Sequence, residues 1–318
     1  MLKVYSPYTA EQIGEYPLIP MDAIEGIVAT ANDLFEDRSK WLKPHERKAI
    51  LQRCAKIMES RIYDLTKLAA NEGGKPFSDS EVEVLRAING VEIAAENIGE
   101  LKGGEIPMGL TPASEGRIAF TQREPIGIVA SVSAFNHPLN LIVHQVITAV
   151  AAGCPVIVKP APTTPMSCEA LVGILKEAGL PEGWCQMVIC ENDVAERLIT
   201  DKRINYFSFI GSSKVGWYLR SKLSPGTRCA LEHGGAAPVI VEPDANFEEM
   251  VPSLLKGAFY HAGQVCVSVQ RVFAHESICK KLAKEIASGA KKLKVGDPMD
   301  ASTEVGPLIL PREVDRVE

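Results

Sequence analysis

Short apolar segments rich in β-forming residues alternate with amphipathic segments of about 10 to 15 residues along the middle of this chain. The apolar segments are GIVASVSAF (127–135), PVIVKPA (155–161), WCQMVIC (184–190), YFSFIG (206–211) and APVIVEP (237–243). Such an alternation is typical of βαβ units, in which each helix connects two parallel strands. It predicts an α/β fold with a doubly wound parallel sheet and helices on both faces.

The flanking regions suggest further elements. Residues 46–70 and 84–98 carry apolar side chains at spacings of three and four, which predicts two helices. We expect Asn71-Glu-Gly-Gly74 to end the first helix and Ser78 or Ser80 to cap the second. The run RIAFTQR, together with the strand-like segment after it, predicts a projecting arm at about 117–132. A domain seam is expected near Gly234-Gly235, followed by the strand VQRVFA and a Lys-rich helix at 280–294.

The composition argues against nucleic acid and membranes as partners. The chain of 318 residues has 34 Lys and Arg against 40 Asp and Glu, and it lacks a basic block that would follow a phosphate backbone. The longest apolar run, 139–154, is interrupted by polar residues and is shorter than the roughly 20 residues of a membrane span. The segment MLKVYSPYTAEQ does not resemble a secretion signal. We therefore expect a soluble, cytoplasmic protein.

Eight cysteines are scattered along the chain without a Cys-x-x-Cys pair or a cluster at zinc-binding spacing. Neither a disulfide framework nor a metal site is expected, and most of these thiols should be small buried side chains. Cys266, in YHAGQVCVSVQR, is a candidate for chemistry. A reactive thiolate needs partial exposure and a positive potential, and the neighbouring residues alone do not distinguish Cys266 from an ordinary cysteine.

Strand-to-helix turns are where a doubly wound sheet binds ligands, because helix N-termini there offer free N–H groups to phosphate. In FIGSSKVG, a strand ends at Gly211, Ser212 opens a helix, and Gly216 follows one turn later. Glycine allows the close approach of a pyrophosphate, and Ser212 can cap the helix or donate to phosphate. The same pattern is also that of an ordinary turn. It is neither a G-x-G-x-x-G fingerprint nor a P-loop.

Two charged residues lie at comparable strand ends. Lys159 closes the strand PVIVK, so its side chain leaves the sheet at the edge that binds ligands, although a solvated lysine would give the same pattern. Glu232, in ALEHGG, lies at a tight turn where burial would raise its pKa and suit it to general-base chemistry. A structural carboxylate fits this position equally well.

Taken in order, these segments resemble the aldehyde dehydrogenase superfamily along nearly the whole chain. AFNHP resembles the segment with the family's oxyanion-binding Asn, VIVKPAP its cofactor lysine strand, and FIGSSKVG its Gly-Ser-Thr-x-x-Gly turn. ALEHGG resembles the Glu-Leu-Gly-Gly box, GQVCVSVQR the Gly-Gln-x-Cys box, and LKVGDPMDASTEVGPLI a downstream signature with Gly-Asp-Pro and Gly-Pro-Leu-Ile. The order of the segments is far more specific than any one of them.

The resemblance implies oxidation of an aldehyde to its acid. The thiolate of Cys266 would attack the aldehyde carbon, and the amide of Asn136 and the backbone N–H of Cys266 would hold the oxyanion. Hydride transfer to a nicotinamide cofactor would leave a thioester. Glu232 would then activate the water that hydrolyses it.

The resemblance also implies a cofactor site and a division of the chain. The cofactor is expected to be NAD, with NADP possible. Its ribose would bind Lys159, and its pyrophosphate would bind the turn of Gly211, Ser212 and Gly216. Residues 1–232 would form the NAD(P)-binding domain and residues 233–318 the first part of the catalytic domain. A homodimer or homotetramer, assembled through the arm, is the expected state of the full-length protein.

Three departures from the family pattern stand out. His233 replaces the leucine of the Glu box, a position expected to act through its backbone. Pro162 stands where many NAD-preferring members carry a ribose-binding Glu, which leaves the choice between NAD and NADP open. The chain also stops at Glu318, well over a hundred residues before family members end, so we expect a fragment or a truncated product.

Two alternatives share this fold: a binding protein without turnover, and an enzyme that transfers the acyl group to coenzyme A. The segments around Asn136, Glu232 and Cys266 look most like members that oxidise small anionic or hydroxylated aldehydes, of the phosphonoacetaldehyde and lactaldehyde dehydrogenase type. The resemblance implies Arg86 and His137 as substrate contacts: phosphonoacetaldehyde-type members place an arginine at the position of Arg86, and His137 follows Asn136. A guanidinium suits an anionic substrate because it binds two oxygens at once. A solvated helix face is the alternative for Arg86. Val265 stands where phosphonate-specific members carry another arginine, so the identity of the aldehyde remains open.

Overall fold

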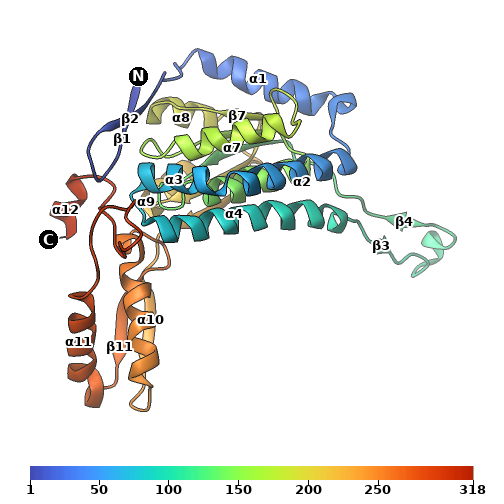
Figure 1. Cartoon of the computed structure of the whole chain (residues 1–318). Helices are drawn as coiled ribbons and strands as arrows, with labels where there is room; N and C mark the ends of the chain where they lie inside the picture. Colours follow the sequence, from blue (N-terminus) through green and yellow to red (C-terminus); the bar gives the residue numbers. More distant parts are fainter. Residues whose placement is uncertain (318) are drawn as a thin grey trace.

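The computed structural model describes residues 1–317, and a five-stranded parallel sheet lies at its centre (Figure 1). The strands are β5 (Ile128–Val132), β6 (Val156–Lys159), β7 (Cys185–Met187), β8 (Ile204–Gly211) and β9 (Arg228–His233), in the order β7-β6-β5-β8-β9. From β5 the chain extends the sheet first through β6 and β7, and then on the other side through β8 and β9. The direction reverses between β5 and β8, so the expected doubly wound α/β fold is confirmed.

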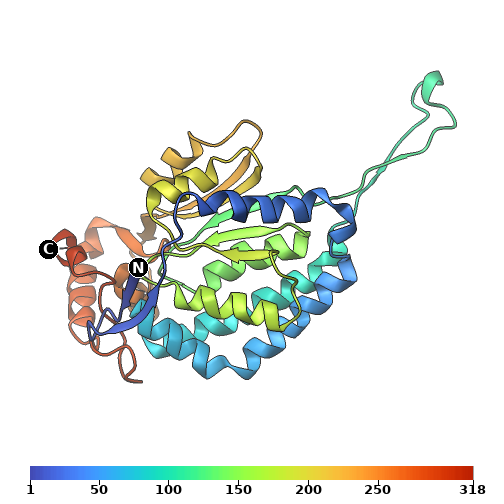
Figure 2. The same ribbon diagram turned by 90° about the horizontal axis from the view of Figure 1, so that it is seen from above.

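Helices cover both faces of the sheet (Figure 2). One face carries α2 (Pro44–Ser60), α3 (Ile62–Gly73), α4 (Phe77–Asn97), α7 (Met166–Glu177) and the successive segments α5 (Asn140–Ile142), η4 (Val143–Ile147) and α6 (Thr148–Ala152); the other carries α1 (Ala23–Glu36), α8 (Asn192–Ile199) and α9 (Ser213–Arg220). In β6, Val156 and Val158 belong to the first core, whereas Ile157 belongs to the second. The strand is apolar throughout because successive side chains point to opposite, equally buried faces.

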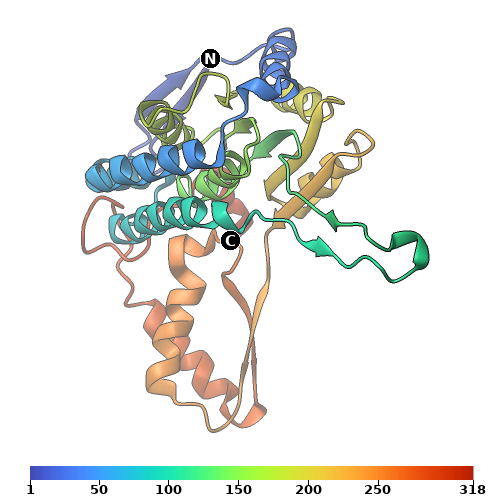
Figure 3. The same ribbon diagram turned by 90° about the vertical axis from the view of Figure 1, so that its right-hand side faces the viewer.

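A smaller parallel sheet follows, formed by β10 (Ala237–Val241) and β11 (Val269–Ala274) (Figure 3). It packs with α10 (Phe247–Phe259) and α11 (Glu276–Ala290), and the short elements η5 (Tyr260–Gly263) and α12 (Arg312–Val317) complete this part. Val241, Leu254 and Leu282 form a separate apolar core. The chain therefore passes from one sheet to the other between residues 233 and 237. The division into domains at residues 232 and 233 stays a prediction.

A projecting arm is present, but the predicted bounds of about 117–132 are wrong. The strand β4 (Ala119–Phe120) pairs with β3 (Glu105–Ile106), and this hairpin, with η3 (Pro112–Ser114) near its tip, projects from the body (Figures 2 and 3). The segment 128–132 does not belong to it, because β5 is the central strand of the large sheet. Ile118 and Phe120 are 89% and 74% exposed, so this hairpin has no core of its own. A role in oligomerisation remains a prediction.

The N-terminal part differs from the expected pattern in three details. A hairpin of β1 (Leu2–Tyr5) and β2 (Gln12–Tyr16) precedes the helices, and the short turns η1 (Arg38–Lys40) and η2 (Ile98–Glu100) lie among them. The helix expected over 46–70 is broken at Arg61 into α2 and α3. The caps at Ser78 and Ser80 are wrong, because α4 begins at Phe77 and Pro76 occupies the N-cap position. The end of α3 is as expected, with Gly74 in the left-handed conformation (φ 72°).

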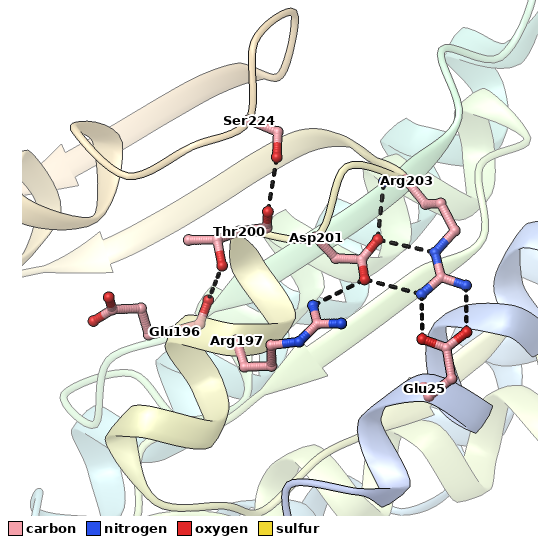
Figure 4. Close-up of polar contacts among 7 residues, drawn as sticks. All are labelled: Glu25, Glu196, Arg197, Thr200, Asp201, Arg203 and Ser224. Atoms are coloured by element: carbon pink, nitrogen blue, oxygen red, sulfur yellow. Dashed lines mark hydrogen bonds and ion pairs between the residues drawn. The ribbon is translucent and has the colours of Figure 1, made fainter.

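At the amino-terminal edge of the sheet, a charged network joins α1, α8 and β8 (Figure 4). Arg203 donates from Nη1 and Nη2 to Glu25 at 2.7 and 2.8 Å, and from Nε to Asp201 at 2.9 Å. Arg197 adds a contact to Asp201 at 3.0 Å. The hydrogen bonds from Arg203 hold the pKa of Asp201 well below its usual range. The contacts to Asp201 therefore stabilise the fold only while Asp201 is ionised.

We expect Arg203→Met to lower the free energy of unfolding by about 2 kcal/mol at neutral pH, between the values typical of exposed and of fully buried ion pairs. Because the pKa of Asp201 is depressed in the folded state, its contribution is complete above the unfolded pKa of about 4 and is lost at lower pH. The difference between wild type and variant should therefore shrink from pH 7 to pH 3 in chemical denaturation. Arg61→Met, which removes an exposed ion pair to Glu177, is the control. An equal difference at both pH values would contradict the assignment.

Candidate active site

The carboxyl edge of the large sheet gathers most of the predicted site. Lys159 and Gly211 are the last residues of β6 and β8, and Asn136 follows β5 by four residues. In the register of β8 and β9, Ile210 pairs with Glu232 and Gly211 with His233. Glu232 and the turn at Gly211 therefore lie on neighbouring strands beside the point where the strand order reverses. This is the place where sheets of this kind bind ligands.

A cavity of about 620 Å³ extends along one face of the large sheet, from the amino-terminal ends of β5 and β6 to the carboxyl ends of β8 and β9. Glu232 is exposed within β9, so the burial at a tight turn expected for it is wrong, and Cys266 lies in the loop before β11. Both residues line the cavity, as does His233. The remaining lining residues come from the large sheet and the helical segment after β5: Ile126, Val129, Leu141, His144, Gln145, Thr148, Ala149, Ala152, Cys154, Tyr206, Ser208, Ile210 and Ala230. A mostly apolar cavity with a few polar groups is typical of a small-molecule site. Asn136 and His137 do not line this cavity.

Exposure distinguishes Cys266 from most other cysteines. Burial raises the pKa of Cys54 and Cys185 to about 12, and it also raises the pKa of Cys154, Cys168 and Cys190. Such thiols stay protonated and unreactive. Cys266 is exposed and faces the cavity, whereas the other exposed cysteine, Cys279, lies on α11 outside it. Of the cysteines, Cys266 best meets the requirement of access.

The chain reaches Cys266 through an unusual turn. His261 and Ala262 adopt left-handed backbone angles, with φ of 50° and 52°, which non-glycine residues rarely do. His261 is fully buried, which holds the turn in place. Gln264 then fastens the loop: its Nε2 donates to the carbonyl of His261 at 3.1 Å, and its Oε1 accepts from the N–H of Ile309 at 2.9 Å. The Gly-Gln-x-Cys and Gly-Pro-Leu-Ile segments are therefore in direct contact.

A glycine joins the loop of Cys266 to the end of β9. A Cβ atom at Gly235 would lie 2.4 Å from the carbonyl oxygen of Cys266, far inside van der Waals contact. Only glycine lets the two backbones approach this closely. The second glycine of the ALEHGG segment thus brings the loop of Cys266 against the strand that carries Glu232.

His233 points to the other face of β9, toward α9. Its ring makes edge contacts with Trp217 and Phe209, with centroid distances of 5.5 and 6.2 Å. It fills the space beside Gly216, where an added Cβ would lie 2.3 Å from the imidazole Nε2. The ring therefore packs the helix of the FIGSSKVG turn against the sheet, as an apolar side chain would.

The predicted cofactor residues lie along the same edge. The hydroxyl of Ser212 caps α9 by accepting from the N–H of Val215 at 3.4 Å. Lys159 and Pro162 line a second, smaller cavity of about 130 Å³ together with Glu191. Burial lowers the pKa of Lys159. A helix N-terminus and a nearly buried lysine are groups that suit the phosphates and the ribose of a dinucleotide.

The expected substrate residues differ in charge. Burial, and the positive charges of Lys75 and Arg86, lower the pKa of His137 to about 3, so this ring is neutral at neutral pH. Its Nε2 lies 3.3 Å from the hydroxyl of Tyr260. Arg86 is exposed on α4, and none of the ion pairs of residues 1–317 includes it. It also lowers the pKa of His144, which lines the large cavity. Arg86 itself does not line the large cavity.

Several residues at the site escaped the sequence analysis. Asn136 is held by Lys75, whose Nζ donates to its backbone carbonyl at 3.4 Å, and Lys75 is paired with Glu83. Gln264 and Gly235 organise the loop that carries Cys266, and both stand inside recognised segments where they could have been singled out. Lys75, in the turn between α3 and α4, and Glu83, on α4, carry no such signal, because charged residues at such positions normally face solvent.

Residues 1–317 contain neither a metal-binding cluster nor a membrane-spanning helix. No group of three or more His, Cys, Asp or Glu side chains in this part is arranged to hold a metal ion. None of its helices combines the length and apolar character that a membrane crossing requires.

Comparison with known proteins gives a consistent result. The chain is 35% identical over its whole length to 3-sulfolactaldehyde dehydrogenase of Priestia aryabhattai and to lactaldehyde dehydrogenase of Methanocaldococcus jannaschii, covering 66% and 68% of them. The crystal structure of glyceraldehyde-3-phosphate dehydrogenase GapN from Methanocaldococcus jannaschii, complexed with NADP, matches the whole chain and 69% of its own length, with 34% identity and a TM-score of 0.93. The chain thus spans about two thirds of the length of these relatives. The family profile "Aldehyde dehydrogenase family" matches residues 1–318, and the chain belongs to this family.

Proposed function

We propose that this chain oxidises a small anionic or hydroxylated aldehyde to its carboxylic acid, with Cys266 as the nucleophile and NAD(P) as the oxidant. The observation that carries the proposal is that an exposed Cys266 and Glu232 line one cavity, which reaches the carboxyl ends of β8 and β9 in a doubly wound sheet. A nucleophile and a carboxylate base at a site of this kind suit covalent catalysis followed by hydrolysis.

The chemistry proceeds in two stages. The Cys266 thiolate adds to the aldehyde carbon and forms a C–S bond, while the oxyanion is held by the amide of Asn136 and the backbone N–H of Cys266. NAD(P) supplies the acceptor for the hydride that leaves the tetrahedral adduct. The remaining thioester is attacked by water as Glu232 removes a proton, and the C–S bond breaks to release the acid and the thiolate. We favour water over coenzyme A as the acyl acceptor because Glu232 offers the carboxylate base that hydrolysis needs.

The cofactor assignment rests on the residues at the strand ends. Ser212 and Gly211 place the N-terminus of α9 where a pyrophosphate would bind, and Lys159 lies where it would reach a ribose. Pro162 offers no carboxylate to a ribose hydroxyl, so we propose NAD with NADP accepted. The NADP complex of the GapN relative supports this choice.

The proposed substrate class is based on Arg86 and on the relatives. Arg86 is exposed, makes no ion pair within residues 1–317 and acts through its charge on His144, which lines the cavity, so we propose that its guanidinium binds a substrate anion. His137 is neutral and would act as a hydrogen-bonding group. Two relatives are named for sulfolactaldehyde and lactaldehyde, which are small polar aldehydes.

We expect Arg86→Ala to lower kcat/KM for anionic aldehydes by roughly 10- to 100-fold, because one charge-assisted contact is worth about 1.5–3 kcal/mol. The 318-residue chain is assayed with NAD and NADP against phosphonoacetaldehyde, lactaldehyde, succinate semialdehyde and hexanal. Hexanal should be the poorest substrate and should not respond to the variant. Arg86→Lys keeps the charge but loses the bidentate geometry, so its kcat/KM for anionic aldehydes should lie between those of wild type and Arg86→Ala. The substrate class is wrong if hexanal is preferred or if Arg86→Ala costs nothing.

A further inference from the structure

Lys75 and Glu83 form a completely buried ion pair on the edge of the site. Their side chains are 1% and 0% exposed, and Lys75 Nζ donates to Glu83 Oε2. Burying two charges is costly unless further hydrogen bonds satisfy both groups. The contacts of this pair therefore indicate what it holds.

Both partners hold the segment that carries Asn136. The second carboxylate oxygen of Glu83, Oε1, accepts from the backbone N–H groups of Leu139 and Asn140 at 2.9 and 3.0 Å. These N–H groups open the helical segment after AFNHP and have no partner within it. Lys75 Nζ donates to the carbonyl of Asn136 at 3.4 Å. The pair thus holds residues 136–140 at both ends of this five-residue stretch.

The side chain of Asn136 needs such support. Its Oδ1 is buried and has no hydrogen-bond partner within the described residues 1–317. The direction of the amide therefore depends on how its backbone is held. The preceding residue, Phe135, packs against His261 with ring centroids 6.2 Å apart, which joins the stretch to the turn that leads to Cys266.

We propose that Lys75 and Glu83 are positioning residues that aim the Asn136 amide at the oxyanion formed on Cys266. This inference rests on the proposed function, because it needs Cys266 as the nucleophile and Asn136 as an oxyanion donor. A displacement of about 1 Å in an oriented group can cost 100-fold in rate, so a rigid backbone grip has a measurable effect.

The test replaces both charges at once, as Lys75→Met with Glu83→Gln, so that no unpaired charge is left inside. The rate measured is acylation of Cys266 by p-nitrophenyl acetate, which forms the same kind of oxyanion without a cofactor. In the chain that keeps Asn136, we expect the double substitution to lower the acylation rate by roughly 10- to 100-fold. In the Asn136→Ala background the same pair of changes should cost less than about twofold, because the group that it positions is already gone.

A structural role for the ion pair would give a different result. An equal loss in both backgrounds, or no loss in either, overturns the proposal. Glu72→Gln is the matched control: Glu72 is also fully buried and accepts from the N–H groups of Met166 and Ser167 at 2.8 Å, but it caps α7, which does not carry Asn136. Glu72→Gln should reduce stability and leave the acylation rate unchanged. Acylation reduced as much by Glu72→Gln would also overturn the proposal.

Hydrogen exchange separates this inference from the proposed function. The amides of Leu139 and Asn140 should be protected in the unsubstituted chain and should exchange at least tenfold faster in the Lys75→Met, Glu83→Gln variant. If the unsubstituted chain is not acylated at Cys266, the proposed function fails. Hydrogen exchange alone then tests whether Lys75 and Glu83 hold residues 136–140. Unchanged protection in the variant then overturns this inference.

Discussion

Cys266→Ser should abolish NADH formation, by about 10⁴-fold or more, while the affinity for NAD(P) stays within about twofold of wild type. The lost step is covalent: a serine hydroxyl at this position lacks the acidity of a thiol and is not a nucleophile at neutral pH. The residues proposed for the cofactor lie on β6, β8 and α9, which the substitution does not touch. Aldehyde-dependent NADH release and cofactor titration by tryptophan fluorescence check the two halves of the prediction.

Cys279→Ser is the control for this variant, because Cys279 is the other exposed cysteine and lies outside the cavity. It should retain full activity. Activity near that of wild type in Cys266→Ser would remove Cys266 from the mechanism. A loss of cofactor binding in that variant would instead show that the substitution disturbs the sheet edge as a whole.

Glu232→Gln should release one equivalent of NADH per Cys266 and then stop. Hydride transfer precedes hydrolysis, so the first turnover does not need the base, whereas every later one does. We expect steady turnover to fall by roughly 10²- to 10⁴-fold. Rapid mixing with an aldehyde measures the burst, and mass spectrometry of the quenched protein detects the acyl group on Cys266.

Glu177→Gln removes an exposed carboxylate that pairs with Arg61 and should behave as wild type. Steady turnover by Glu232→Gln without a burst would count against Glu232 as the base. A variant without even the first equivalent would place Glu232 in an earlier step, such as removal of the proton from the thiol.

The sheet was accessible to sequence reasoning because its strands are buried on both faces. A strand such as β6, with four buried residues in succession, reads as a continuous apolar run. The strand β9 was missed as a strand, since RCALEH is only partly buried and has no such run. The arm was misplaced for a related reason. Its first strand, β3, is two exposed residues long, and no periodicity can be detected over that length.

The candidate site shows a similar limit. Cys266 and Glu232 could be singled out because each lies in a segment with a recognisable order along the chain, and the structure places both on one cavity. Lys75 and Glu83 could not, because a lysine in the turn between two helices and a glutamate within a helix are normally solvated. Their importance lies in burial and in long-range contacts to residues 136–140, which arise only when α3, α4 and the segment after β5 pack together.

The site is built entirely from parts that are distant along the chain, which bears on how the protein folds. Asn136 follows the central strand β5, Glu232 lies in the edge strand β9, and Cys266 lies in the loop before β11. Contacts of this kind form late, because closing long loops costs entropy before any contact is gained. A chain that has formed only its first βαβ units would carry Cys266 as an ordinary accessible thiol. During refolding, catalytic competence should therefore return in the slowest phase, after most of the helical signal has recovered.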